Sequence, residues 1–419
     1  MRTDPRPQGY RQLFRTPEFT PLFLTSAAQG AAQTVGGLAL ATLVYRATDS
    51  PLLSAVSMFG PSLAQVLGAT TLLSAADRLP PRATMAGVAL AFAAGTALMS
   101  LPGLPIWALF TVVLVLGLIA SLGGGVRWGL LNEILSTGVE GGRDGKAGYL
   151  LGRSVFNMMS GLTQVVGFAT GGVLLTALSP RVALLLAAGL YLAASVGLRL
   201  GLSGRPPRAS GRPSVAATWR TNALLWSSRP RRLTYLGLWI PNGLVVGCES
   251  LYVSYAPDSA GTLFACGALG MLAGDVTVGR LVPPAVRRRL ATPLLLLLAL
   301  PYGFFVLHPA VPVAAVLAAV SSVGFGASLV QQERLMSLTP DELSGHALGL
   351  HSSGMLTMQG VAAALAGSAA QLASPGAAMT VMALTSAGVT LVLATLARQQ
   401  RRARPGSPER QESPATQPA

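Results

Sequence analysis

Long apolar stretches recur along the whole chain, and one polar segment divides them into two groups. Between Gly201 and Arg232 the sequence carries seven arginines and no acidic residue, with six apolar stretches before it and six after it. A stretch of about 20 apolar residues is long enough to cross a bilayer as a helix. The pattern therefore predicts an all-α membrane protein, with twelve transmembrane helices in two pseudo-symmetric six-helix bundles.

The composition is typical of a membrane protein. Charged residues make up 11% of it and hydrophobic residues 51%, whereas about 25% of a soluble domain is charged. The net charge of +15 is spread over separate short loops. Because no basic patch carries aromatic residues that could stack on bases, we expect no nucleic-acid partner.

Polar and apolar segments alternate in a way that sets the domain organisation. We expect a cytoplasmic N-tail at 1–19, a first bundle at 20–200, an Arg-rich linker at 201–232, a second bundle at 233–397 and a disordered tail at 398–419. Ser26-Ala27-Ala28 could pass for a signal-cleavage site, but the apolar run continues to Tyr45, which predicts an uncleaved first span. The expected spans are 20–45, 52–76, 84–101, 105–131, 147–177, 182–200, 233–256, 260–281, 291–307, 311–333, 346–371 and 376–397.

The distribution of basic residues predicts the orientation. With both termini inside, the inner segments hold 26 of the 30 basic residues, and the outer loops hold only Arg46 and Arg181. Basic residues concentrate in cytoplasmic loops. We therefore expect a multi-pass protein of the cell (inner) membrane with both termini in the cytoplasm.

Two local patterns predict details of the helices. Pro61, Pro241 and Pro301 lie inside spans, where proline removes a backbone hydrogen bond, and Pro241-Asn242-Gly243 is the strongest candidate for a helix break. In the linker, apolar residues from Val215 to Trp226 recur at helical spacing. This stretch is expected to lie along the inner membrane surface.

The loop after the second predicted span reads Asp77-Arg78-Leu79-Pro80-Pro81-Arg82. It resembles the signature between the second and third helices of the major facilitator superfamily, with Leu73 and Pro80 where the family has glycines. The resemblance implies two bundles around a central cavity that opens alternately to each side, and an inner gate that includes Asp77, Arg78 and Arg82. A weaker repeat of this loop, with Asp275, Arg280 and Arg287, follows in the second half, and Asp275 and Arg280 are expected to belong to the same gate.

Two further stretches resemble the efflux branch of that superfamily. Residues 44–51 resemble an outer loop of bacterial drug and siderophore exporters, and residues 167–172 resemble a Gly-rich antiporter stretch. Phe168 stands where that stretch has proline, so the helix bend that this proline supplies is not expected here. The resemblance implies export of a small molecule without naming it.

Charged residues within spans are expensive in hydrocarbon, at about 2.5–3.5 kcal/mol or more each. Arg127 and Glu133 fall near the inner end of the fourth predicted span, where they either pair to steady helix ends or take part in the inner gate. Arg153 lies about six residues into the fifth span. It either extends to the interface or faces a cavity and binds an anionic group.

Uncharged polar residues predict a cavity between the halves. Their spacing puts them on shared helix faces, although hydrogen bonds between helices explain each one equally well. The candidates are Gln29, Gln33, Asn157, Gln164 and Gln359.

Glu249 is the span carboxyl most isolated in sequence from any basic residue. We expect it to carry a coupled proton, while a structural hydrogen bond or a direct substrate contact are the alternatives.

These residues form no catalytic constellation, and neither cysteine has metal-ligand spacing, so we expect no enzyme, cofactor or metal. The expected function is export of a small, mostly apolar molecule in exchange for protons. Uptake by a transporter of the same fold, or a non-transporting membrane scaffold or receptor, are the alternatives.

Overall fold

The computed structural model describes residues 13–16, 18–76, 79–136, 144–206, 215–287, 289–340 and 343–402, and these residues are all helical or in short connections. Six long helices of the described residues precede the linker. They are α2 (Phe19–Thr48), α3 (Pro51–Ala76), α4 (Pro81–Met99), α5 (Ile106–Ser136), α6 (Asp144–Ala177) and α7 (Pro180–Gly201).

The linker forms a helix of its own, α8 (Val215–Ser227). The helices after it are more often interrupted. They are α9 (Arg229–Glu249), α10 (Tyr252–Tyr255), α11 (Ala260–Val276) continued by the π-helical turn η1 (Thr277–Leu281), α12 (Pro284–Arg287), α13 (Ala291–Ala299) continued by the 3₁₀ turn η2 (Leu300–Leu307), α14 (Val311–Val323), η3 (Gly324–Gly326), α15 (Ala327–Ser337), α16 (Ser344–Leu372) and α17 (Pro375–Arg402).

Several helices begin where the sequence supplies a start signal. Proline occupies the first turn of α3, α4, α7, α9 and α17, where its missing N–H costs nothing because that donor has no helical partner. Ser179 caps α7 by accepting a hydrogen bond from the Val182 N–H at 3.4 Å. At the C-terminal end of α2, Asp49 adopts φ 50° and its N–H donates to the Tyr45 carbonyl. The chain turns at this residue and continues directly into α3.

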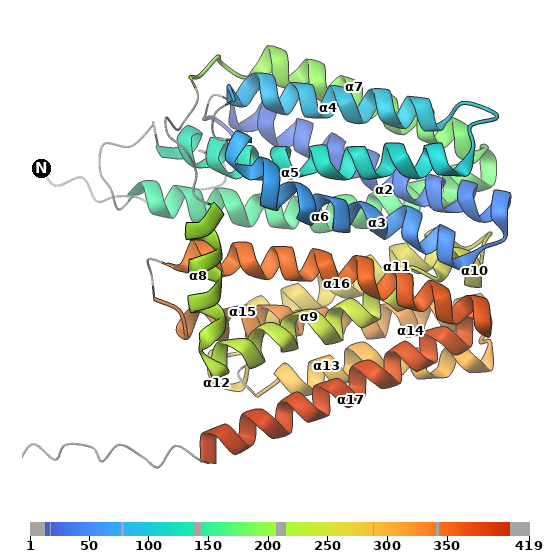
Figure 1. Ribbon diagram of the computed structural model, residues 1–419, viewed down its shortest axis with the longest axis vertical. Coiled ribbons are helices and arrows are strands. Elements are labelled where there is room, and N and C mark those ends of the chain that lie inside the picture. Colours follow the sequence, from blue (N-terminus) through green and yellow to red (C-terminus); the bar gives the residue numbers. More distant parts are fainter. Residues whose placement is uncertain are drawn as a thin grey trace, which may run out of the picture.

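The helices form two groups that lie side by side. In Figure 1, α2–α7 make up the blue-to-green group and α9–α17 the yellow-to-red group, and α8 crosses one end of the molecule. We name the end that carries α8 the proximal end and the opposite one the distal end. The two groups meet where α3 packs on α16 and α6 packs on α11.

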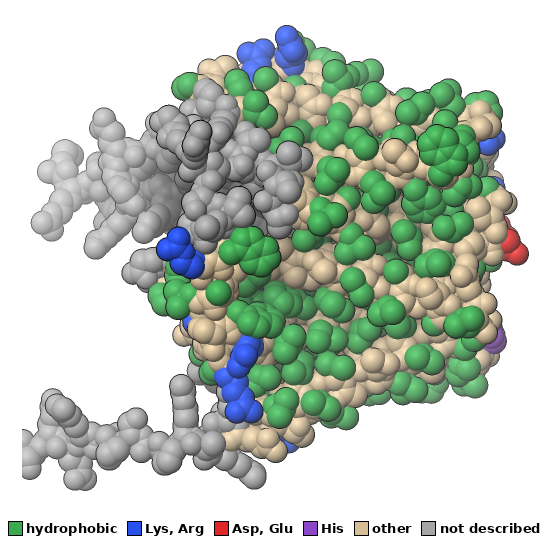
Figure 2. Space-filling model, viewed as in Figure 1, with side chains coloured by type: hydrophobic (Ala, Val, Ile, Leu, Met, Phe, Trp, Pro, Cys, Tyr) green, Lys and Arg blue, Asp and Glu red, His purple; other side chains and the backbone are tan. Residues whose placement is uncertain are grey.

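The sides of the molecule are apolar. Large hydrophobic side chains are exposed along the helices, among them Leu200, Leu372 and Trp107, and Figure 2 shows hydrophobic side chains spread over the lateral face. Nine helical segments of the described residues are long and apolar enough to cross a membrane, and Ala291–Leu307 is a shorter apolar helix. Such a surface is stable in lipid, where helices satisfy their own backbone polar groups.

Within the second group, small residues let helix backbones approach closely. Gly270 and Gly274 of α11 lie against the backbone of α14 at Ala319 and Val323, so closely that a Cβ at either glycine would overlap it. Because no hydrophobic effect drives helices together in lipid, this kind of close packing is a main source of their association.

The predicted break at Pro241-Asn242-Gly243 is wrong, because α9 runs through it without interruption. The Asn242 side-chain amide donates to the Leu238 carbonyl at 2.7 Å, and the Ser386 hydroxyl of α17 donates to the Pro241 carbonyl at 3.1 Å. The stretch is therefore tied to its own helix and to a neighbour. The interruption comes later, between α9 and α10, directly after Glu249.

The other two span prolines behave differently from one another. Pro61 lies inside the continuous helix α3, whereas the change from α-helix to 3₁₀ helix at Leu300 coincides with Pro301.

The predicted linker helix is present. Trp226 of α8 stacks on Trp239 of α9 with ring centroids 5.5 Å apart, and Arg231 donates to the Leu224 carbonyl at 3.0 Å. These contacts fix α8 across the proximal end of α9.

Candidate binding cavity

A cavity of about 670 Å³ lies between the two groups of helices. Its size is within the usual range for small-molecule sites, about 300–1,000 Å³. About three quarters of the lining residues come from α2–α7, and the rest come from α9, α10, α11, α16 and the short turn η3. The cavity therefore has one broad wall and one narrow wall, which belong to different halves of the chain.

The broad wall carries most of the polar side chains expected from the sequence. Gln29 and Gln33 of α2 and Gln164 of α6 all line the cavity. Arg127 of α5 lines it too, and its Nη2 donates to Gln29 Oε1 at 2.9 Å. The structure thus brings together a residue predicted for the gate and a residue predicted for the cavity.

Arg127 lies farther from its helix end than the sequence suggests. The predicted span stops at residue 131, but α5 continues to Ser136, so Arg127 is nine residues, roughly 13 Å, from the end of its helix. Tyr191 of α7, which is 6% exposed, is another lining residue and interacts electrostatically with Arg127.

Two lining residues of the broad wall were missed in the sequence. Gln65 and Tyr191 both face the cavity. Gln65 is an amide within an apolar stretch, which is the same signal that identified Gln29 and Gln33. Tyr191 has no such signal, because a tyrosine in a span is equally common at helix interfaces.

The narrow wall carries Glu249, the last residue of α9, and Gln359 of α16. The Ser322 hydroxyl lies beside the Glu249 carboxyl. Gly267 of α11 leaves the space in which these groups meet, because a Cβ there would lie 3.3 Å from Ser322 Oγ, 3.9 Å from Tyr252 Oη and 4.0 Å from Glu249 Oε1. Among the described residues, the ion pairs do not include Glu249.

Contacts between the halves lie at the distal end beside the cavity. Phe168 of α6 stacks on Phe264 of α11 with ring centroids 4.6 Å apart, and both rings line the cavity. One turn closer to the distal end, Gly172 touches Gly261 backbone to backbone, and a Cβ on Gly172 would lie only 2.8 Å from Gly261 Cα.

A hydrogen bond also joins the halves at this end. The Gln371 amide of α16 donates to the Ser50 hydroxyl at 2.6 Å, at the start of α3. We name Phe168, Gly172, Gly261, Phe264 and this hydrogen bond the distal seal.

The residues expected at a gate do not gather in the described part of the structure. Asp77 and Arg78 lie outside the described residues, and Arg82 is half-buried in the first turn of α4. Glu133 is half-buried on α5 and is not a lining residue of the cavity. Asp275 and Arg280 are exposed on α11 and η1.

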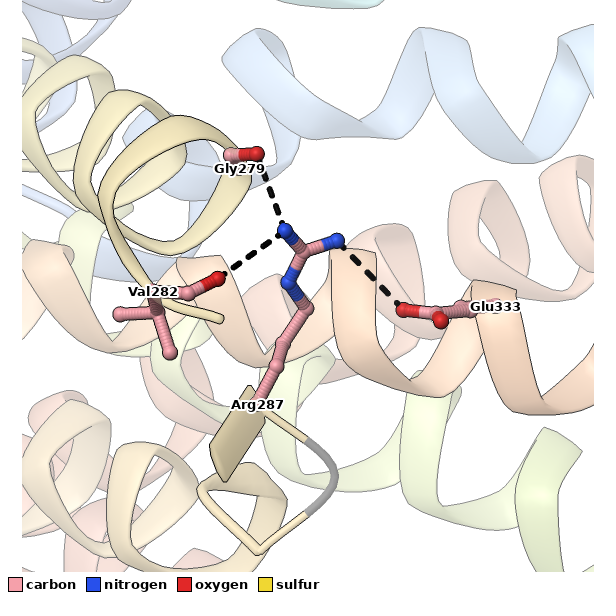
Figure 3. A network of polar contacts seen from close by, with 4 residues as sticks. All are labelled: Gly279, Val282, Arg287 and Glu333. Atoms are coloured by element: carbon pink, nitrogen blue, oxygen red, sulfur yellow. Dashed lines mark hydrogen bonds and ion pairs between the residues drawn. The ribbon is translucent and has the colours of Figure 1, made fainter. Parts of the chain in front are cut away.

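The weak repeat of the Asp77 loop does form a polar network in the second half. Figure 3 shows Arg287 pointing toward the end of η1 and toward α15. Arg287 Nη2 donates to the Gly279 and Val282 carbonyls at 3.1 and 3.2 Å, and Nη1 lies 3.6 Å from Glu333 Oε2. The network joins η1, α12 and α15 within one half.

Two other candidates cannot be placed. Arg153 and Asn157 lie on α6, but their side chains lie outside what the structure describes.

No protein-family model matches the chain, and no curated protein matches it. Among solved structures the chain is similar to a POT family transporter in complex with 5-aminolevulinic acid, at 12% identity and a TM-score of 0.73, covering 94% of this chain and 98% of that one. It is also similar to the peptide transporter POT in complex with sulfate, at 15% identity and a TM-score of 0.69, over 96% and 98% of the two chains.

A third similar structure is a point mutant of the nucleoside transporter NupG, at 11% identity and a TM-score of 0.71, covering 91% of this chain and 98% of that one. At such identities the likeness concerns the fold. The chain is therefore an all-helical, multi-pass membrane protein with the major facilitator fold.

Proposed function

We propose that this protein is a secondary transporter that exports a small, mostly apolar molecule across the cell membrane in exchange for protons, by alternating access. The observation that carries the proposal is the cavity, whose two walls belong to different halves and which is bordered at one end by contacts between those halves. In the transporter folds built from repeats, rocking of one half against the other around such a site moves the substrate.

The proposal includes twelve spans with both termini in the cytoplasm. Helices α2 and α16 and the α13–η2 segment add three spans to the nine that meet the length and hydropathy criteria among the described residues. The proximal end, with α8 and the Arg-rich linker, then faces the cytoplasm. In this orientation the distal seal closes the outer side.

Glu249 is the proposed proton carrier. It borders the cavity, lies at the interruption between α9 and α10, and has Ser322 and Tyr252 as polar neighbours. A charged carboxylate buried within the bilayer costs about 2.5–3.5 kcal/mol or more, and a bound proton removes that charge. Protonation at this position would therefore change how easily the two halves close over the residue.

Export is favoured over uptake by the sequence stretches 44–51 and 167–172, which resemble the efflux branch. The similar structures are those of peptide and nucleoside transporters, and these names do not specify a direction of transport. The similar structure of a POT family transporter is a complex with 5-aminolevulinic acid. A cavity of this size with amide side chains in its wall supports transport over a scaffold role, since a scaffold has no need of buried amides.

The test uses everted membrane vesicles that respiration has made acidic inside, so that the cytoplasmic face of the protein is outside. A library of small apolar compounds is added while a pH-sensitive dye reports the vesicle interior. A proton-coupled exporter should move a compound in and protons out, and the dye should report a rise of internal pH. An uptake transporter coupled in the same direction as protons should respond only in right-side-out vesicles, and a scaffold should respond in neither.

Glu249→Gln separates the possible roles of this carboxyl, since it keeps the shape and removes the titrating group. If Glu249 carries the proton, the variant should exchange a preloaded compound at a near-wild-type rate but lose the proton signal and the pH-driven accumulation. Wild-type accumulation would make the carboxyl structural. Loss of both exchange and accumulation in a correctly inserted variant would make it a substrate contact.

A further inference from the structure

We propose that Arg127, oriented by Gln29, is the subsite for one oxyanion group of the transported molecule, so that the cargo is an amphipathic organic acid. The inference rests on the proposed function, because it names the class of molecule that the cavity takes. It concerns only equilibrium binding in the cavity, and proton coupling and transport direction do not enter it.

The first step is the charge of Arg127. It lies in the interior of α5 and lines the cavity. Among the described residues, no ion pair neutralises it, and its one hydrogen-bond partner is the neutral amide of Gln29. A cation in hydrocarbon is costly unless it is paired or hydrated. Its location in a cavity wall, away from the helix end, indicates a partner that enters from the cavity.

The second step is the set of donors. A guanidinium has five N–H donors and no acceptor. One Nη2 donor is used by Gln29, and Nε is buried without a hydrogen-bond partner within the described structure, so a ligand in the cavity can meet only the remaining N–H groups of Nη1 and Nη2. A guanidinium with free donors matches the planar, bidentate geometry of a carboxylate or another oxyanion.

The third step is the orientation of Gln29. Because Arg127 can only donate, the atom of Gln29 that faces it must be the carbonyl oxygen Oε1. The NH₂ group of Gln29 is thereby left as a donor next to the guanidinium. The two side chains therefore offer donors to the same acceptor, and the hydrogen bond between them holds the guanidinium in place before a ligand binds.

The fourth step is the body of the molecule. The lining of the same cavity contains Met85, Phe92, Met159 and Tyr191, which suit an aromatic or aliphatic body. The carboxyl of Glu249 is in the opposite wall, on the other half of the chain. An acid bound at Arg127 therefore places its charge on the first half and leaves its apolar part to span the cavity.

The test compares aromatic monocarboxylates of increasing size with their primary amides, which have nearly the same shape and no charge. The purified full chain is held in nanodiscs of a single zwitterionic lipid, so that lipid phosphate is the same in every measurement. Melting temperature against ligand concentration gives the affinity of each compound. We expect at least one acid to bind about tenfold more tightly than its amide.

Four variants assign that preference. Arg127→Gln should abolish the difference between acid and amide, and Arg127→Lys should retain part of it, since an ammonium offers no fork. Arg181→Gln, a matched loss of an exposed arginine at the distal end, should leave the difference unchanged. Gln29→Glu leaves the arginine in place but supplies an internal carboxylate, and it should also abolish the preference, so the test does not depend on the folding of one variant.

The proposal is overturned if no acid of the series binds more tightly than its amide in the wild type, or if the preference survives in Arg127→Gln. Neither result affects the vesicle assay for proton exchange, in which the acids of the series are tested beside the apolar library. Failure of the proposed function would instead appear there, with no proton movement for any compound while the binding preference persists.

Discussion

The contact between Gly172 and Gly261 brings the backbones of the two halves together at the distal seal, and it exists because neither residue has a side chain. The backbones touch directly, and the stacked rings of Phe168 and Phe264 lie one turn farther into the molecule. Phe168 replaces the proline of the antiporter stretch that residues 167–172 resemble, and α6 continues through it as one helix. The residue thus contributes an aromatic contact to the seal in place of a bend.

Adding one methyl group to Gly172 should therefore open the distal end. A Cβ at this position would lie 2.8 Å from Gly261 Cα, and overpacking of this kind costs about 1–3 kcal/mol. Spin labels at Ala47→Cys and Leu372→Cys, in a background with Cys248 and Cys266 replaced by alanine, should report longer distances across the distal end in Gly172→Ala. The matched change Gly189→Ala meets nothing within 4 Å and should leave the distances as in the parent. Identical distributions in all three proteins would show that the seal does not depend on this contact.

At the scale of elements, the turn from α11 to α12 is held by Arg287. Its hydrogen bonds go to two backbone carbonyls at the end of the π-helical turn η1, whereas its ion pair is made with Glu333, whose side chain is 49% exposed (Figure 3). An exposed ion pair contributes little, about 0–1 kcal/mol. The carbonyls at a helix end, in contrast, need a donor.

Arg287→Ala should consequently destabilise the protein more than Glu333→Gln does. We expect a loss of about 1–3 kcal/mol for the arginine and under about 1 kcal/mol for the glutamate, measured as midpoint shifts in denaturant titrations of the purified chain. Equal losses would mean that the ion pair, and not the hydrogen bonds to the carbonyls, holds this turn.

The elements also show which parts of the structure were accessible from the sequence. Each predicted span overlaps a helix, because long apolar runs leave the backbone little alternative in lipid. The continuity of α9 through Pro241 was not predictable, since it depends on whether other groups bond to the nearby carbonyls. Asn242 is adjacent in sequence, but Ser386 comes from α17, and only the packing of α9 on α17 brings it there.

The candidate site was recognised in part for a similar reason. The four-residue spacing of Gln29 and Gln33 indicated one shared face, and the structure places both in the cavity wall. That face could equally have packed on a neighbouring helix. Arg127 was assigned to the inner helix end because the predicted span ends at residue 131. The helix itself continues to Ser136.

At the scale of the whole molecule, the proposed orientation gives each loop a side of the membrane. Arg46 and Arg181 lie at the distal end and are exposed, while Arg205 follows α7 at the other end and pairs with Glu18 at 2.7 Å. Cysteine at position 46 or 181, in the background without native cysteines, should react with an impermeant maleimide in intact cells. Cysteine at position 205 should react only after the membrane is permeabilised, and labelling of it in sealed cells would reverse the topology.

The unequal share of the two halves in the cavity has a consequence for how such a chain can acquire new cargo. About three quarters of the cavity wall, including Arg127 and its amide neighbours, belongs to the first half, while Glu249 belongs to the second. Substitutions in the first half can alter which molecule binds, while Glu249, the carboxyl that we propose for proton coupling, stays unchanged. Descendants of one gene could thus acquire different cargo by keeping the second half unchanged while substitutions accumulate in the first half.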